Sequence, residues 1–323
     1  MTDKNPFTLI ASHRQEPAMQ PLSRALESLD GLSAGDAFGQ CFFQLVDPEA
    51  NVAERRLPPA PWHYTDDTEM SLSILAVLAR RGRIDQDLLA GSMAARYDYD
   101  RAYGPSMHRV MARIGKGEDW RDVAASTFEG QGSWGNGAAM RAAPLGAFFA
   151  DDLALAAAQA ALSAEVTHSH AEGVAGAVAV ALAAAQASRL RGCATLPASR
   201  DFLESVVALL PPSEVRSRIV RAQSIGSVNS LQFAVSILGN GIGMSAQDTV
   251  PFALWCCSHH LDNYEEALWL AVSAGGDRDT ICAIVGGIVA CSAGAAAVPL
   301  EWTSRREPLP HWHLPTGTEH GVR

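Results

Sequence analysis

Apolar residues recur along most of the chain at intervals of three and four positions, which places them on one face of a helix. One such face runs from Met70 to Leu78, a second from Val174 to Leu182 and a third from Ile281 to Val289. Alternating apolar and polar runs joined by Asn-Gly turns, which indicate strands, are hard to find. The pattern therefore predicts an all-α protein with about a dozen helices.

Small residues dominate the longest apolar segments. Residues 171–187 are mostly glycine and alanine, which let helix backbones approach closely. Residues 280–300 carry no charge and have the ~17–25-residue length of a membrane span, but their Ala, Gly, Cys and Ser content and Pro299 favour a buried central helix. No stretch is long enough for an interdomain linker. We therefore expect one domain over residues 1–323, with a core of about residues 22–300 and polar, peripheral termini.

Charge and cysteine content exclude several classes of partner. The chain has 25 Lys and Arg against 35 Asp and Glu, a net charge of -10. Lysine occurs only at Lys4 and Lys116 and the arginines are scattered, so neither charge-driven nucleic-acid binding nor a polybasic membrane patch is expected. The 6 cysteines form no CxxC pair, and the first residues of the sequence do not show the apolar h-region of a signal peptide. These features predict a cytoplasmic protein without a membrane partner, and we expect a monomer.

Two acidic clusters each precede an apolar helix. Residues 65–69 read Thr-Asp-Asp-Thr-Glu, and residues 275–280 read Gly-Gly-Asp-Arg-Asp-Thr. Each cluster alone is explained by helix capping, as at Asp151-Asp152. If the two helices pack together, however, four carboxylates face one another and need cations between them. The sequence therefore predicts two divalent cations, Mg²⁺ or Mn²⁺, held by Thr65, Asp66, Asp67, Asp277, Asp279 and Thr280.

A glycine-rich loop provides the second candidate site. Residues 130–137 contain four glycines and precede a segment, from Ala138, that is predicted to begin a helix. Successive backbone N–H groups and a helix N-terminus suit a diphosphate or another anion. Trp134 in this loop either stacks on a base or sugar or packs locally, and His168 is a candidate for one substrate hydrogen bond. Asp36, between Gly35 and Gly39, is interpreted as a satisfied acid in a closely packed helix.

The order of these motifs resembles the ADP-ribosylglycohydrolase family, of the dinitrogenase reductase-activating glycohydrolase and ADP-ribosyl-acceptor hydrolase type. The resemblance covers the chain from about Leu26 to Gly294. The motifs that carry it are Gly31-x3-Gly35-Asp36-x2-Gly39, Thr65-Asp66-Asp67-Thr68, Tyr103-Gly104, Gly132-Ser133-Trp134-Gly135-Asn136-Gly137-Ala138-Ala139-Met140-Arg141, Thr167-His168, Leu238-Gly239-Asn240-Gly241-Ile242 and Gly275-Gly276-Asp277-Arg278-Asp279-Thr280.

The resemblance implies a compact, orthogonal multi-helix bundle with a dinuclear Mg²⁺ or Mn²⁺ centre in a central cleft. It implies a metal-dependent hydrolase that cleaves the glycosidic bond between ADP-ribose and a modified protein side chain, small molecule or nucleotide. The same six residues of the two acidic clusters match the metal ligands of the family. The residues expected to hold ADP-ribose are Gly104, Ser133, Trp134, Gly135, Asn136, His168 and Ile242.

The chain departs from the family pattern at the expected general acid or base. Serine-specific relatives carry a glutamate shortly after the Gly-Asp-x-x-Gly motif, whereas residues 40–44 here read Gln-Cys-Phe-Phe-Gln. Asp67, Asp100 and Glu49 remain candidates for this role, and the acceptor linkage stays open. Arg278 stands where many relatives carry a small residue or threonine.

The sequence leaves two alternatives to this activity. One is a non-catalytic ADP-ribose-binding or crystallin-like member of the family, which the absent glutamate favours. The other is an unrelated all-α dimetal enzyme, such as a terpenoid synthase or a nucleotide phosphohydrolase. Met70 replaces the last Asp of a DDxxD motif and the chain has no His-Asp dipeptide, so the second alternative is disfavoured.

Overall fold

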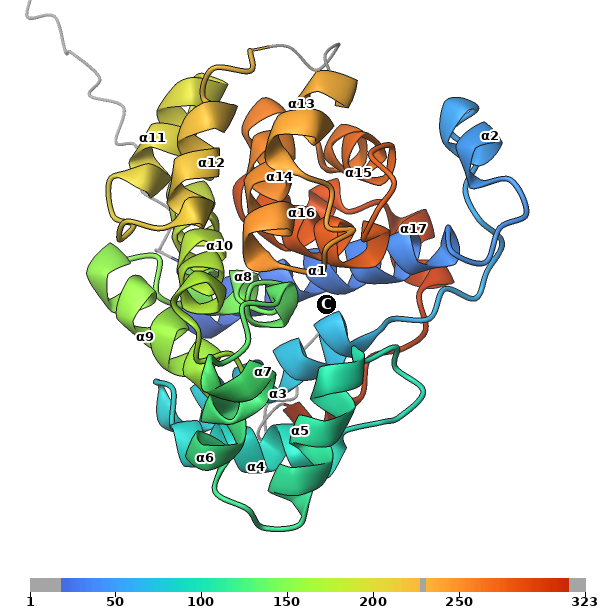
Figure 1. Ribbon diagram of the computed structural model, residues 1–323. Helices are drawn as coiled ribbons and strands as arrows, with labels where there is room; N and C mark the ends of the chain where they lie inside the picture. Colours follow the sequence, from blue (N-terminus) through green and yellow to red (C-terminus); the bar gives the residue numbers. More distant parts are fainter. Residues whose placement is uncertain (1–18, 227–230, 314–323) are drawn as a thin grey trace, which may run out of the picture.

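The computed structural model describes residues 19–226 and 231–313 of the chain. These residues form helices and two isolated bridges but no strand, which confirms the all-α prediction (Figure 1). The α-helices are α1 (Pro21–Cys41), α2 (Pro48–Ala53), α3 (Asp66–Arg81), α4 (Gln86–Arg96), α5 (Pro105–Gly115), α6 (Trp120–Ala125), α7 (Thr127–Gly130), α8 (Ala143–Phe148), α9 (Leu153–Glu165), α10 (Ala171–Leu190), α11 (Ser199–Val207), α12 (Glu214–Ala222), α13 (Leu231–Leu238), α14 (Ala246–His259), α15 (Tyr264–Val272), α16 (Arg278–Ala293) and α17 (Leu300–Arg305). Short 3₁₀ turns are η1 (Asn136–Ala138), η3 (Ala295–Ala297) and η4 (His311–His313).

Each of the three apolar faces that the sequence shows belongs to one helix of the structure. They lie on α3, α10 and α16, and the uncharged segment after Asp279 forms the buried α16 as expected. The helix predicted from Ala138 is different, because only the turn η1 forms there and α8 begins at Ala143. Pro144, in the first turn of α8, fixes that later start, since proline is favoured at the first positions of a helix.

The central pair of the fold is α1 against α16, and three glycines make it close. A Cβ atom added at Gly31, Gly35 or Gly39 would lie 2.4, 2.2 or 2.4 Å from a carbonyl oxygen of α16. Those oxygens belong to Gly286, Cys282 and Arg278, respectively. The spacing of four residues on both helices places all three contacts on one antiparallel seam. Because Gly39 meets Arg278, the seam brings the C-terminal part of α1 to the start of α16.

Aromatic side chains fix the same end of α1. The Phe38 ring stacks on Trp302 with centroids 4.3 Å apart, and it meets Trp269 and Phe42 edge-on at 5.1 and 5.0 Å. All these rings are at most 3% exposed. Edge-on and stacked pairs of this kind add to the stability gained from apolar burial. The cluster therefore holds the turn of α1 that contains Asp36 against α15 and α17.

Helix α10 packs against α8, α9, α14 and α16. In Figure 1 it lies on the left of the view, whereas α17 lies on the right. By length and composition α10 is the one helix among the described residues that is apolar enough to cross a membrane, but 72% of its apolar window is buried inside the fold. Its alanines from Ala175 to Ala187 are buried against neighbouring helices, so its hydropathy is explained by packing.

Candidate functional site

The two acidic clusters meet where α3 and α16 begin. Thr65 caps α3, and Asp277 takes the capping position of α16. Asp66 lines the same cleft as Asp277, Asp279 and Thr280. Thr65 and Asp67 are only 1% exposed and lie behind the cleft surface. The structure thus brings together the side chains that the sequence predicts as metal ligands.

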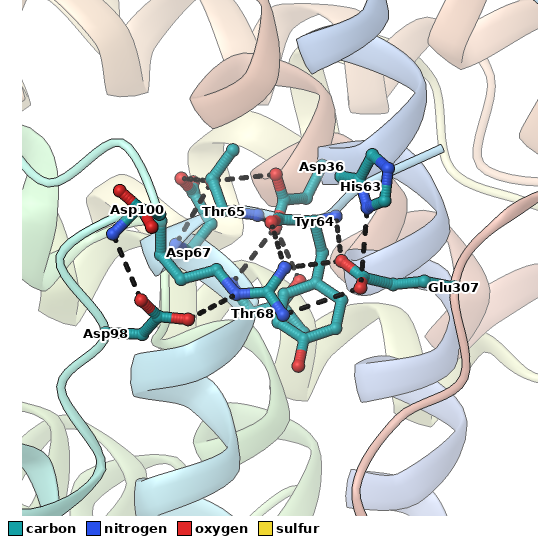
Figure 2. Close-up of polar contacts among 10 residues, drawn as sticks. Asp36, His63, Tyr64, Thr65, Asp67, Thr68, Asp98, Asp100 and Glu307 are labelled. Carbon is teal, nitrogen blue, oxygen red and sulfur yellow. Dashed lines mark hydrogen bonds and ion pairs between the residues drawn. The ribbon is translucent and has the colours of Figure 1, made fainter. Parts of the chain in front are cut away.

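Asp36 of α1 joins this cluster, a role that the sequence interpretation missed. Its Oδ2 accepts hydrogen bonds from Thr65 N at 2.9 Å, Thr68 N at 3.2 Å and Thr68 Oγ1 at 2.5 Å. Its Oδ1 accepts one from Thr65 Oγ1 at 2.8 Å (Figure 2). Asp36 therefore anchors the first turn of α3 on α1. The signal that could have revealed it is the single acid between two glycines on an otherwise uncharged helix face.

Burial and mutual repulsion raise the pKa values of the cluster. Burial raises the pKa of Asp36 to about 7 and, together with the charge of Asp279, that of Asp277 to about 8. Burial also raises the pKa values of Asp66 and Asp67 well above the ordinary range, and neighbouring carboxylates add to the effect. Fully ionised, these groups would repel one another at low dielectric. The cluster therefore requires protons or cations.

The donor set fits hard divalent cations, which prefer carboxylate and hydroxyl oxygen. Asp67 Oδ1 and Asp279 Oδ1 are buried and accept no hydrogen bond from residues 19–226 or 231–313. The Thr65 hydroxyl has one proton but lies 2.8 Å from Asp36 Oδ1 and 2.9 Å from Asp67 Oδ2. No three His, Cys, Asp or Glu side chains of the described residues are yet arranged to hold a metal ion together. Binding a cation thus requires these carboxylates to turn toward it.

A cleft of about 450 Å³ opens over the cluster. This volume lies within the ~300–1,000 Å³ range of small-molecule sites. Six of the seven residues predicted to hold ADP-ribose line it, namely Gly104, Ser133, Trp134, Gly135, Asn136 and His168. Ile242 is 78% exposed and does not line the cleft, but its neighbours Gly243 and Met244 do.

The glycine-rich loop is fixed between the cleft and α14. Ala246 N donates to Trp134 O at 3.0 Å, and Asn136 N donates to Met244 O at 3.2 Å. The Asn136 amide donates to Asp277 Oδ2 at 2.6 Å, which joins the loop to the carboxylates. Gly132 has a φ of +77°, and an added Cβ would lie 2.3 Å from Ser169 Oγ. The loop conformation therefore needs glycine at this position.

A buried hydrogen-bond chain fixes His168. Arg141, which is 0% exposed, donates to Thr167 Oγ1 at 2.9 Å, and Thr167 Oγ1 lies 2.7 Å from His168 Nδ1. Because that hydroxyl accepts from Arg141, its own proton is free for Nδ1, and this assigns the ring proton to Nε2. Burial lowers the pKa of His168 to about 3, so the ring is neutral. His168 therefore presents a neutral N–H donor beside Gly135 and Gly137.

An aromatic pair lines the part of the cleft that adjoins a further cavity at Phe128. The rings of Phe128 and Trp134 lie with centroids 4.7 Å apart, and both residues line the cleft. Phe128 and Glu129 have φ values of +49° and +59°, a left-handed conformation that bulky side chains rarely adopt. Such strain is concentrated at functional sites. Nothing in the sequence pattern marked Phe128 or Arg109, which also lines the cleft.

The candidate acids and bases lie in three different settings. Asp67 is buried within the carboxylate cluster. Asp100 lines a second cavity of about 330 Å³, which shares Ala102 with the cleft and also contains Thr65. Glu49 of α2 is exposed and pairs with Arg278 at 3.0 Å, so it lines neither cavity. Glu49 is therefore the ion-pair partner of Arg278, whose role the sequence did not reveal.

Known proteins share this fold and sequence pattern. The sequence profile described as ADP-ribosylglycohydrolase matches residues 17–315. ADP-ribosylhydrolase ARH3 of Mus musculus is 29% identical over 336 residues, covering 87% of each chain. ADP-ribosylarginine hydrolase Tri1 of Pseudomonas putida is 24% identical, covering 88% of this chain and 75% of the relative.

A solved structure gives the same result. The chain described as an ADP-ribosylglycohydrolase-related protein complex has a TM-score of 0.63 and 25% identity, covering 89% of this chain and 93% of that chain. An uncharacterized protein of Archaeoglobus fulgidus is 32% identical over 288 residues, covering 84% of this chain and 88% of the relative. This protein therefore belongs to the ADP-ribosylglycohydrolase family and is a hydrolase that acts on ADP-ribose.

Proposed function

We propose that the protein hydrolyses the glycosidic bond between ADP-ribose and a modified acceptor and depends on divalent cations. The observation that carries this proposal is the cluster of buried carboxylates from α1, α3 and α16 directly beside the cleft. Such a cluster is costly unless cations occupy it. A protein of net charge -10 needs that local positive charge to bind a dianion.

The residues of the two helix starts would hold two cations, Mg²⁺ or Mn²⁺. These residues are Thr65, Asp66, Asp67, Asp277, Asp279 and Thr280. When bound, the cations neutralise the carboxylates, orient ribose hydroxyls and withdraw electron density from the scissile bond. Asp36 supports this set by fixing both threonines at the start of α3.

The rest of the cleft supplies binding and orientation. The glycine-rich loop lines the cleft with residues 133–137 and would hold the diphosphate there, and His168 Nε2 donates beside it. Phe128 and Trp134 offer aromatic faces to the adenine base at the end of the cleft. This order places the distal ribose at the carboxylates and the adenosine at the aromatic pair.

The acceptor would lie toward the second cavity, which adjoins the cleft at Ala102. Asp100 lines that cavity, whereas Asp67 is enclosed in the carboxylate cluster and Glu49 pairs with Arg278 (Figure 2 shows Asp67 and Asp100). A general acid must reach the leaving group directly or through one water. We therefore assign Asp100, among the three candidates, to proton transfer at the leaving group.

The test is a release assay on arginine-, serine-, cysteine- and nucleotide-linked ADP-ribose, with Mg²⁺ or Mn²⁺ and with EDTA. At least one conjugate should release ADP-ribose, and EDTA should abolish the release. Asp66→Asn and Asp279→Asn should each lower turnover by a factor of about 100 or more, because each removes a cation ligand. Asp100→Asn should lower turnover by a factor of about 100 with the affinity for the cations unchanged.

Asp152→Asn is the matched control. Asp152 caps α9 by accepting from Leu155 N at 3.0 Å, and asparagine caps a helix equally well. Its activity should equal that of the unaltered protein. Release that persists in EDTA, or that survives in Asp66→Asn, contradicts cation dependence. Binding of ADP-ribose without release from any conjugate would instead identify a non-catalytic family member.

A further inference from the structure

The aromatic end of the cleft continues into a further cavity of about 240 Å³. This cavity lies between α5 and the turn that joins α6 to α7. It shares Ser106, Arg109 and Phe128 with the cleft, so the two spaces adjoin. Its remaining lining residues are Val110, Arg113, Ser126 and Thr127. No residue of this cavity takes part in the cation or diphosphate sites described above.

The cavity is basic in an otherwise acidic protein. The segment from Pro105 to Gly117, which includes α5, contains arginine and lysine but no aspartate or glutamate. Arg109 is exposed, and within the described residues its guanidinium makes no hydrogen bond or ion pair. Arg113 pairs with Glu118 at 2.6 Å and donates to Ser126 Oγ at 2.8 Å. Arg109 therefore supplies the uncompensated charge.

Two hydroxyl groups that line this cavity have no free proton to offer a ligand. Ser126 Oγ donates to Val123 O and Thr127 Oγ1 donates to Ala124 O, each at 2.8 Å. Their single protons are therefore already engaged. The donors still available to a ligand belong to Ser106 and the two arginines. A ligand that satisfies several such donors is rich in acceptor oxygens and negatively charged.

Helix capping does not account for Arg109. Basic residues are favoured in the last turn of a helix by the helix dipole, and Arg113 and Lys116 occupy such positions on α5. Arg109 stands near the middle of α5, outside its last turn, where the dipole gives a cation no stabilisation. The acids nearest this surface are Glu118, which Arg113 engages, and the exposed Asp122 and Glu129.

We propose that this cavity is an anion subsite for a phosphate group attached to the adenosine side of ADP-ribose. This inference rests on the proposed function, which places the adenosine at Phe128. Because Phe128 and Arg109 line both spaces, a substituent on the adenosine ribose extends from the cleft toward the two guanidinium groups. The phosphate is either a monoester on the 2′-hydroxyl or the diphosphate of a neighbouring ADP-ribose unit in a polymer.

The test compares ADP-ribose, ADP-ribose 2′-phosphate and the linear dimer of ADP-ribose with Mg²⁺ present. Affinities are measured by displacement of a fluorescent ADP-ribose immediately after mixing, before hydrolysis. At least one phosphate-bearing ligand should bind about tenfold more tightly than ADP-ribose, the effect of one charge-assisted hydrogen bond. A preference for the monoester or for the dimer identifies the source of the phosphate, and raising the salt concentration should reduce it.

Arginine variants locate the effect. Arg109→Gln should remove most of the preference, measured as the ratio of the two affinities in the same variant so that any change in ADP-ribose binding cancels, and Arg113→Gln should reduce it. Arg83→Gln, at an exposed loop position outside both cavities, is the charge-matched control and should retain the preference. Equal affinities for all three ligands, or a preference that survives in Arg109→Gln, overturns the subsite alone. Failure to bind ADP-ribose at all overturns the proposed function and the subsite with it.

Discussion

Asp36 illustrates how a single side chain joins two elements of the site. Its carboxyl group takes four hydrogen bonds from Thr65 and Thr68, so the start of α3 is tied to α1. From the sequence, Asp36 is interpreted only as a satisfied acid in a closely packed helix, because a lone acid does not repeat the same chemistry at a fixed spacing. The pairs Asp66-Asp67 and Asp277-x-Asp279 are recognisable since each repeats the same chemistry at a helix start.

The Asp36→Asn variant tests this anchoring role. Asparagine offers one acceptor oxygen and turns an NH₂ group toward donors, so part of the threonine network loses its partner. We expect the Kd for Mn²⁺ to rise about tenfold and turnover to fall by at least as much. Isothermal titration with Mn²⁺ and the release assay measure both effects.

Asp30→Asn is the matched control on the same helix. Asp30 has a half-exposed side chain that pairs with Arg306 at 3.4 Å, whereas the hydroxyls of Thr65 and Thr68 donate to Asp36. Asp30→Asn changes the net charge by the same amount as Asp36→Asn. The Mn²⁺ affinity of Asp30→Asn should nevertheless remain within about twofold of that of the unaltered protein. An Asp36→Asn protein that binds Mn²⁺ as tightly as this control would show that Asp36 has no anchoring role.

At the level of elements, the predictable part of the fold is the part with helical spacing. Helices α3, α10 and α16 follow from apolar periodicity, and the start of α3 follows from Thr65 as a capping residue. The conformation of residues 126–135 does not, because Phe128 and Glu129 adopt left-handed backbone angles without glycine. Phe128 packs on Trp134 and Gly132 packs against Ser169, and a local pattern does not encode such contacts.

The glycine seam between α1 and α16 predicts the effect of Gly35→Ala. The added methyl group would lie 2.2 Å from the carbonyl oxygen of Cys282, and backbone cannot yield as a side chain does. The two helices must separate, which moves Asp36 away from Asp279. We expect the free energy of unfolding to fall by about 1–3 kcal/mol and Mn²⁺ affinity to fall with it. Denaturant unfolding and Mn²⁺ titration provide the measurements.

Gly91→Ala on α4 is the control for the seam. A Cβ at Gly91 meets nothing within 4 Å, and alanine is the better helix former by about 1 kcal/mol. This variant should be as stable as the unaltered protein or more stable. If Gly35→Ala behaved in the same way, the close approach of α1 and α16 would not determine the position of the carboxylates.

For the whole molecule, the sequence indicates an acidic all-α protein whose charge is partly concentrated at one site. That two distant acidic clusters meet is predictable from their shared chemistry, since residues 65–69 and 275–280 both open apolar helices. The position of Asp36 in the carboxylate cluster and the basic cavity beside α5 both depend on how the helices cross. Crossing geometry follows from side-chain packing over the whole core, so a single sequence does not reveal it.

The concentration of carboxylates predicts an unusual pH dependence for the metal-free protein. Asp36 and Asp277 have folded pKa values of about 7 and about 8, above the ordinary value of 3.8. Between pH 3.8 and about 8 the folded state therefore binds more protons than the unfolded state. Over that range the free energy of unfolding falls as the pH rises. His168, with a pKa lowered to about 3, acts in the opposite sense only below about pH 6.5.

In EDTA, lowering the pH from about 8.5 to about 6.5 should therefore raise the free energy of unfolding by about 1–3 kcal/mol, or Tm by a few degrees. With saturating Mn²⁺ the trend should reverse, because cations compete with protons for the same oxygens and bind best at the higher pH. Asp277→Asn removes one group that binds a proton in the folded state. In EDTA it should therefore reduce the slope of the free energy of unfolding against pH by up to about 1.4 kcal/mol per pH unit. A metal-free stability that rises from pH 6.5 to 8.5 would show that the carboxylates are not clustered as the structure has them.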